Sequence, residues 1–107
     1  MPHYLIQASY APEALTALTK NPTNRLDMIE NLLKSIGGRL ETGYFSFGEY
    51  DVAMIVELPD NAAAAGLAIR TGGTGAIKSF KTTPLLTAEE AVAAMQFAGR
   101  IDYQPPG

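Results

Sequence analysis

The fold of this protein is decided by Arg39-Leu-Glu-Thr-Gly-Tyr-Phe-Ser-Phe-Gly-Glu-Tyr-Asp-Val-Ala-Met-Ile-Val-Glu-Leu-Pro59. β-Branched and aromatic residues on both sides of a Gly48-Glu49 turn predict two strands that form a hairpin. Pro59 ends the second strand, because proline cannot continue the strand ladder. Asp51 lies at the start of that strand, where its carboxylate has to be solvated, be paired with another group, or take part in binding or catalysis. Asp51 is therefore the first candidate for a functional site.

The segments before the hairpin predict one strand and two helices. His3–Tyr10 is rich in β-prone residues and is predicted as a strand. A helix is expected from Ala11-Pro12-Glu13, since proline is tolerated in a first turn, with Leu15 and Leu18 turned inward. A second helix is expected after Asn21-Pro22, ending at a Gly-Gly pair and carrying apolar residues at helical spacing. These residues are Leu26, Ile29, Leu32, Leu33 and Ile36.

The segments after the hairpin predict a helix, a strand and a last helix. Asp60 or Asn61 is expected to cap an alanine-rich helix, because short polar side chains accept hydrogen bonds from the first turn. Gly75–Thr83 is predicted as the fourth strand. Thr87-Ala-Glu-Glu90 has capping-box spacing and is expected to open the last helix, and residues 100–107 form an extended tail.

The order β-α-β-β-α-β-α predicts an α+β fold: a ferredoxin-like split β-α-β sandwich with a four-stranded antiparallel sheet and an extra C-terminal helix. We expect one domain over residues 1–107. Helices cover one sheet face, which should carry Val52, Met54 and Val56. The other face is too apolar to remain wet, so a second copy is expected to cover it and form a dimeric α/β barrel. Its apolar residues are Leu5, Phe45, Phe47, Ala53 and Ile55.

The composition excludes several classes of function. The 107 residues are 47% hydrophobic and 18% charged, with a net charge of -3, so the chain lacks the basic character of a nucleic-acid-binding protein. Cysteine is absent, which excludes thiolate chemistry and disulfides. We expect no metal and no cofactor, since the chain has a single histidine. No membrane-spanning run and no basic leader are found, so a cytoplasmic protein is expected.

Six stretches, spread over nearly the whole chain, are together typical of one family. They are Met1-Pro-His-Tyr-Leu-Ile-Gln-Ala-Ser-Tyr10, Asn21-Pro22 with Arg25, Gly37-Gly38, Tyr44-Phe-Ser-Phe-Gly-Glu-Tyr-Asp51, Leu58-Pro-Asp60 and Lys81-Thr-Thr-Pro-Leu-Leu-Thr-Ala-Glu-Glu90. By these stretches the chain resembles the GYD-domain family, although Glu49 separates the glycine of the Gly-Tyr-Asp signature from Tyr50-Asp51. The resemblance implies a ferredoxin-like, dimeric barrel domain, and it implies no catalytic residue.

Four residues are candidates for catalysis. Asp51 is a candidate general base or ligand anchor; alternatively, it pairs with a cation or accepts backbone N–H bonds at the hairpin. Tyr44 and Tyr50 flank the hairpin, where a phenol either donates to a ligand or is a packed aromatic. His3 is a candidate acid–base group, or else a histidine at the surface or the dimer rim.

Candidates for ligand binding are Gln7, Ser9, Arg25, Asp51 and Lys81. Arg25 is expected at the start of a helix, where its charge opposes the helix dipole, and this placement indicates either a specific anionic partner or a solvated side chain. Lys78 lies near Lys81 in the sequence, but the two point to opposite strand faces and form no single site.

Three functions remain open from the sequence. The first is an oligomeric barrel protein that binds a small molecule or has a regulatory role. The second is a cofactor-independent enzyme acting on a small carbonyl or aromatic substrate, with Asp51 as the base. The third is a purely structural assembly subunit. All three expect a homodimer or a higher homo-oligomer, without nucleic-acid or membrane partners.

Overall fold

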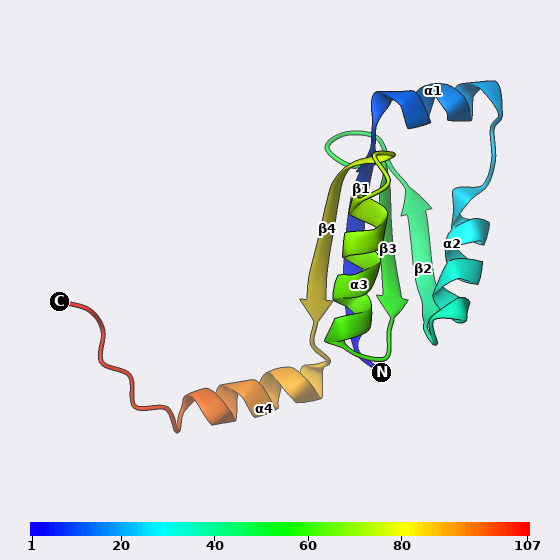
Figure 1. Cartoon of the computed structure of the whole chain (residues 1–107). Helices are drawn as coiled ribbons and strands as arrows, with labels where there is room; N and C mark the ends of the chain where they lie inside the picture. Colours follow the sequence, from blue (N-terminus) through cyan, green and yellow to red (C-terminus); the bar gives the residue numbers. More distant parts are fainter.

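The hairpin predicted over residues 39–59 forms one side of a four-stranded antiparallel sheet in the computed structural model, which describes Met1 to Gly107. The strands are β1 (His3–Tyr10), β2 (Arg39–Phe45), β3 (Val52–Glu57) and β4 (Ile77–Leu85), in the order β2-β3-β1-β4. The helices are α1 (Pro12–Lys20), α2 (Arg25–Ser35), α3 (Asn61–Gly72) and α4 (Ala88–Ala98). This arrangement confirms the predicted α+β, ferredoxin-like fold (Figure 1).

Three of the helices begin at a side-chain cap. Asn24 accepts a hydrogen bond from the Leu26 amide at the start of α2, and Asp60 accepts one from the Ala63 amide at the start of α3. Thr87 opens α4 with the predicted capping box. These caps satisfy amides that the first turn of a helix leaves free. Helix α1 has no side-chain cap and relies on a proline in its first turn.

The core lies between the sheet and helices α2 and α3. Strand β3 alternates strictly between buried and half-buried residues, as expected for a strand with one covered face. Tyr4 is also buried there, and its hydroxyl donates a 2.6 Å hydrogen bond to Asn61 Oδ1, which ties β1 to the start of α3. The core residues are Tyr4, Ile6, Leu33, Met54, Val56, Leu58 and Ala64.

The register corrects the expected position of Phe45. One extra residue in β2, between Leu40 and Thr42, shifts the pairing of this strand against β3. Phe45 therefore pairs with Val52, whose side chain is on the helix-covered face, and Phe45 belongs to that face rather than to the open one. Phe47 lies in the loop before β3 and is fully exposed.

Two strand boundaries differ from the predictions. Strand β3 begins at Val52, so Tyr50 and Asp51 lie in the loop that precedes it. Strand β4 begins two residues later than predicted, since Gly75 has a positive φ of 77° and forms a turn. It also continues through Pro84 to Leu85. Proline is tolerated there because β4 is an edge strand with no partner on its outer side.

Helix α1 does not pack as expected. It has no buried residue: Leu15 is 43% exposed, and only Leu18 and Ala14 are half-buried. Figure 1 shows α1 lying across one end of the sheet, α2 beside β2, and α3 over the β1 and β4 side. The strip of sheet between α2 and α3 is therefore left without a helix directly on it.

Helix α4 leaves the body of the domain. Figure 1 shows it pointing away from the sheet, with the C-terminal tail extending farther in the same direction. None of its residues is buried, and residues 101–107 form no helix or strand, as predicted for the tail.

Candidate ligand-binding site

A large cavity lies on the helix-covered side of the sheet. It has a volume of about 580 Å³, and 14 of its 20 lining residues are hydrophobic. Ligand pockets of proteins are commonly of this size, mainly apolar, with a few polar groups that orient the ligand. The cavity forms because α1 and α2 do not close the strip between α2 and α3.

The residues that line the cavity come from the sheet, from three helices and from the segment around the start of β4. The sheet supplies the floor with Ala8, Val52, Met54 and Phe80. The three helices and the turn before β4 supply the sides. The main side-wall residues are Ala14, Ala17, Leu18, Ile29, Leu32, Leu67 and Ile77. The alanines contribute to the hollow because a methyl group fills little space. Leu32 is 47% exposed, so apolar surface remains uncovered at this site.

Two arginines are the only charged residues that line the cavity. Arg25 is the first residue of α2, and Arg70 lies in the last turn of α3. Neither forms an ion pair, since the four ion pairs of the chain involve His3, Lys34 and Arg39 as the cations. Arg25 Nη1 lies 3.0 Å from the Met28 sulfur, which is a weak acceptor. Both guanidinium groups therefore keep donors for a ligand.

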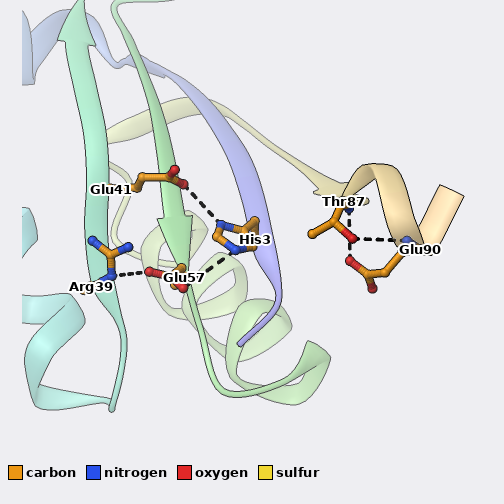
Figure 2. A network of polar contacts seen from close by, with 6 residues as sticks. All are labelled: His3, Arg39, Glu41, Glu57, Thr87 and Glu90. Atoms are coloured by element: carbon orange, nitrogen blue, oxygen red, sulfur yellow. Dashed lines mark hydrogen bonds and ion pairs between the residues drawn. The ribbon is translucent and has the colours of Figure 1, made fainter.

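A cluster of charges occupies the opposite, open face of the sheet (Figure 2). The His3 imidazole lies between two carboxylates, with Nδ1 3.1 Å from Glu41 Oε2 and Nε2 3.6 Å from Glu57 Oε1. Arg39 Nε forms an ion pair with Glu57 Oε2, an oxygen that is buried and has no hydrogen bond of ideal geometry. These charges largely neutralise one another, which leaves this cluster less suited than the arginine pair to hold a charged ligand.

The cluster follows from the alternation of side chains along β2 and from the pairing of His3 with Glu57 across β1 and β3. Arg39 pairs with Glu57 in the register, and Leu40 faces the helices opposite Val56. Glu41 is the additional residue before Thr42, and it turns to the open face within reach of His3. A smaller cavity of about 240 Å³ beside His3 is lined by Glu41, Ile55 and the segment 85–87.

Asp51 lies at the other end of the sheet from His3. One of its carboxylate oxygens accepts a 2.8 Å hydrogen bond from the Tyr10 amide, and its own amide donates to the Ala8 carbonyl. His3 and Tyr10 are at opposite ends of β1, about 20 Å apart at the usual strand rise. Asp51 therefore fastens the hairpin loop to the end of β1, and no catalytic pair with His3 is formed.

The structure brings Ser9 and Tyr50 to the same hairpin loop as Asp51, whereas the other predicted site residues lie elsewhere. Ser9 donates its hydroxyl to the Glu49 carbonyl, and Tyr50 lies in the same loop, where its carbonyl accepts from Ser46. Gln7, Lys81 and Tyr44 all lie on the open face. Gln7 of β1 pairs with Lys81 of β4 on one side and with Ala53 of β3 on the other, and Tyr44 of β2 also pairs with Ala53. Tyr44 is 71% exposed and Lys81 is exposed. Among the predicted residues, only Arg25 lines the large cavity.

Sequence reasoning missed Arg70 and the acidic half of the open-face cluster. Arg70 lies in an alanine-rich helix with no charged neighbour, and a basic residue in a last turn is usually explained by the helix dipole. Glu41 reaches His3 across β3, and this depends on the strand order β2-β3-β1, which no local pattern announces. The available signal was that Arg39 and Glu41, two residues apart in β2, and Glu57 in β3 are charged residues in otherwise mostly apolar strands.

One carboxyl group has a clearly altered pKa. The Thr87 backbone amide, followed by the Thr87 hydroxyl, lowers the pKa of Glu90 below its ordinary value through the capping box. Three or more potential metal-ligating side chains do not converge anywhere in the chain. None of the helices has the length and apolar character that a membrane crossing requires.

The comparison with protein families gives one match. The GYD domain matches residues 4–95 of the 107-residue chain. This range begins in β1 and ends in α4, so it includes the whole sheet and the large cavity. Comparisons with curated proteins and with solved structures gave no match. The chain therefore belongs to the GYD-domain family.

Proposed function

We propose that this GYD-domain protein is a homo-oligomeric protein that binds a small molecule in the cavity between its helices and its sheet. The observation that carries the proposal is the apolar cavity of about 580 Å³. The cavity is open to solvent on one side and leaves apolar side chains such as Leu32 in contact with water. A ligand that fills the cavity would remove this apolar surface from water, which is favourable.

Binding is favoured over catalysis because the candidate catalytic groups do not meet. Asp51 uses its carboxylate to hold the Tyr10 amide, and His3 lies about 20 Å away along β1. A general base and a hydrogen-bond donor have to reach one substrate at hydrogen-bond distance. The proposed enzyme with Asp51 as base lacks this arrangement within one chain.

Self-association is supported by the amount of surface that a single chain exposes. The accessible surface is 7500 Å², whereas a folded monomer of 11.4 kDa exposes about 5,800 Å². The excess of about 1,700 Å² is roughly twice the area that a standard interface covers on each partner. The open sheet face, with Leu5 and Ile55 at its centre, is the surface on which we expect a second copy.

The binding proposal is tested with a neutral apolar fluorophore, N-phenyl-1-naphthylamine. Ala14→Phe places a large ring in the cavity wall and should abolish the fluorescence increase of the probe. Thr16→Phe is the matched control, because Thr16 is exposed on the same helix and does not line the cavity. Equal binding by both variants and by the unaltered protein would place the probe elsewhere and contradict the proposal.

The oligomeric state is tested by sedimentation velocity over a range of micromolar concentrations. We expect a dimer or a larger species, and Ile55→Glu should shift the protein to monomers because it places a charge at the centre of the open face. A folded protein that sediments as a monomer at all of these concentrations would contradict self-association and leave the binding proposal standing. If the chain oligomerises but the cavity binds nothing, the third function, an assembly subunit, is favoured.

A further inference from the structure

We propose that the ligand of the large cavity is an amphipathic organic anion, with an apolar body in the cavity and a carboxylate held by Arg25 and Arg70. This inference rests on the proposed binding function and specifies its ligand class. It follows from the charges that line the cavity and from those that are missing there.

All the charged residues that line the cavity are cations. Arg25 and Arg70 are its only ionisable side chains apart from the Tyr10 phenol, and it contains no aspartate and no glutamate. The whole chain, by contrast, has a net charge of -3. A positive site in a negatively charged protein favours an anion over a cation or a neutral molecule.

The two guanidinium groups are unpaired cations that line the cavity, whereas the other unpaired cations, such as Lys20, Lys78 and Lys81, lie outside it. Arg39 is paired with Glu57, Lys34 lies 3.3 Å from Glu30, and Arg100 lies over the Phe97 ring. Arg25 and Arg70 have no carboxylate within ion-pair distance. A planar guanidinium forms two parallel hydrogen bonds to a carboxylate, so a free pair of them is well suited to an acid head group.

The position of Arg25 strengthens this argument. It is the first residue of α2, where the helix dipole is positive, and acidic residues are the usual neighbours of such an end. A cation there is less favourable than an anion, and Asp27 of the same turn forms no ion pair with Arg25, so a bound anion would stabilise it. Half-burial at the edge of an apolar cavity further strengthens the attraction, because less water screens it.

A few polar side chains line the cavity next to each arginine in the sequence. Asn21 and Thr23 come from the α1–α2 connection before Arg25, and Thr71 follows Arg70 directly. The remaining lining is mostly apolar. A mostly apolar lining with a few polar groups beside two cations matches an aliphatic or aromatic acid more closely than a sugar or a nucleotide, which would need polar partners throughout.

The experiment compares octanoate, octan-1-ol and octylamine as displacers of N-phenyl-1-naphthylamine from the full chain. We expect octanoate to bind at least about 10-fold more tightly than octan-1-ol, and octylamine more weakly than both. Arg25→Gln and Arg70→Gln should each weaken octanoate about 5-fold or more and leave octan-1-ol nearly unchanged. Lys34→Gln is the matched control, since Lys34 is a paired cation on the same helix as Arg25.

Two results would be distinguished. If the neutral probe binds, and Ala14→Phe blocks it, but octanoate and octan-1-ol bind equally, the ligand class is wrong and the binding function stands. If the neutral probe does not bind at all, the proposed function itself fails. Circular dichroism of each variant checks that it is folded.

A separate observation concerns α4 and the tail, which we call the arm (residues 88–107). We infer that the arm packs against the second copy that covers the open sheet face. The radius of gyration is 17.1 Å, whereas a compact domain of 107 residues has about 13 Å, because the arm points away from the body (Figure 1).

The arm is too apolar to remain in water. Val92 and Met95 lie on one side of α4 and are 51% and 69% exposed, and Phe97 lies on the opposite side and is 61% exposed. A helix that is apolar all round is normally enclosed by protein. A helix of 11 residues is also marginal in water by itself, despite the good capping box at its start.

The second copy is the occupant because the arm starts at the open face. Leu86 and Thr87 line the small cavity together with His3, Glu41 and Ile55, all of which belong to that face or its edge. A copy covering Ile55 would therefore meet the first turn of α4. The arm then continues beyond the edge of its own sheet, where its own domain offers no surface (Figure 1).

Hydrogen exchange measured by mass spectrometry over a dilution series tests this inference. We expect α4 amides to be protected about 10-fold or more in the oligomer and to lose that protection as the protein dissociates. Met95→Glu should abolish the protection and weaken association, whereas Gln96→Glu, a charge at the neighbouring polar position, should do neither. Unprotected α4 amides in a stable oligomer, or protected ones in a monomer, would overturn the inference.

Discussion

The two faces of the sheet use their charges in opposite ways. On the open face, the side chains of His3, Arg39, Glu41 and Glu57 form polar contacts with one another within the cluster. On the helix-covered face, Arg25 and Arg70 border a large apolar cavity and have no acidic partner. The difference indicates that a face with paired charges and apolar neighbours is suited to another protein surface. A cavity with unpaired charges is suited to a small ligand of opposite charge.

The largest expected effect comes from a pair of neighbours on β1. Ile6 is 1% exposed in the core, and Leu5 is half-buried on the open face. Ile6→Ala should lower the free energy of unfolding by roughly 2–5 kcal/mol, because it leaves a cavity in the core. Leu5→Ala should cost about 1 kcal/mol or less in dilute protein and more at high concentration, where the proposed second copy would cover it. Urea denaturation at two protein concentrations measures the loss of unfolding free energy for each variant. If the loss from Leu5→Ala were the same at both concentrations, the proposed difference between the two faces would be wrong.

The next effect concerns the end of the sheet where the hairpin loop is fastened. Asp51→Ala removes the acceptor for the Tyr10 amide and should lower the free energy of unfolding by about 1–2 kcal/mol. Asp51→Asn keeps an oxygen that can accept this hydrogen bond and should cost roughly half as much. Thermal denaturation of both variants provides the measurement. Two variants with unchanged stability would show that Asp51 is not fastening the loop and would return it to the list of catalytic candidates.

A smaller effect is expected within the open-face cluster. Arg39 is 56% exposed and Glu57 is 13% exposed at the side chain, so Arg39→Gln should cost about 1 kcal/mol or less in a monomer. The exposed Lys34–Glu30 pair on α2 is the control, and Lys34→Gln should cost less, about 0.3–0.5 kcal/mol. Urea denaturation of the two variants checks the order. A larger loss from Lys34→Gln would mean that the cluster does not hold the open face together.

The smallest expected effect is a pH dependence at the start of α4. The capping box lowers the pKa of Glu90 in the folded protein, so its contribution is present above the ordinary value of 4.5 and is lost as the pH falls through the lower folded value. Carbon chemical shifts of α4, followed by nuclear magnetic resonance, should report this fraying below pH 4.5. Thr87→Ala should bring the change to a higher pH, and Thr87→Ser, which keeps the hydroxyl, should not.

Most of the secondary structure was predictable because its signals are local. Asn24, Asp60 and Thr87 mark helix starts through side-chain hydrogen bonds that span two or three residues. The alternation along Val52–Glu57 identified the covered face of β3. Strand β4 was placed two residues early, and its end at Leu85 depended on whether Pro84 would be on an edge strand, which is a property of the whole sheet.

The candidate site was predicted only in part. Arg25 was identified because its charge conflicts with the helix dipole, which is a local contradiction. Arg70 was not identified, because a basic residue at the end of a helix is unremarkable in sequence and gains significance only opposite Arg25. Asp51, Tyr44, Tyr50 and His3 were predicted as catalytic candidates, but the length of β1 separates His3 from the loop that contains Asp51 and Tyr50.

The amino-acid sequence alone determined the family, the element order and the side of the sheet that helices cover, since periodicity and capping act over a few residues. Only the tertiary structure decided that α1 leaves a hollow, that two arginines distant in the sequence border it, and that an added residue in β2 turns Phe45 to the helix-covered face. These features depend on distances between segments far apart in the chain, and packing sets those distances through contacts that no local pattern records.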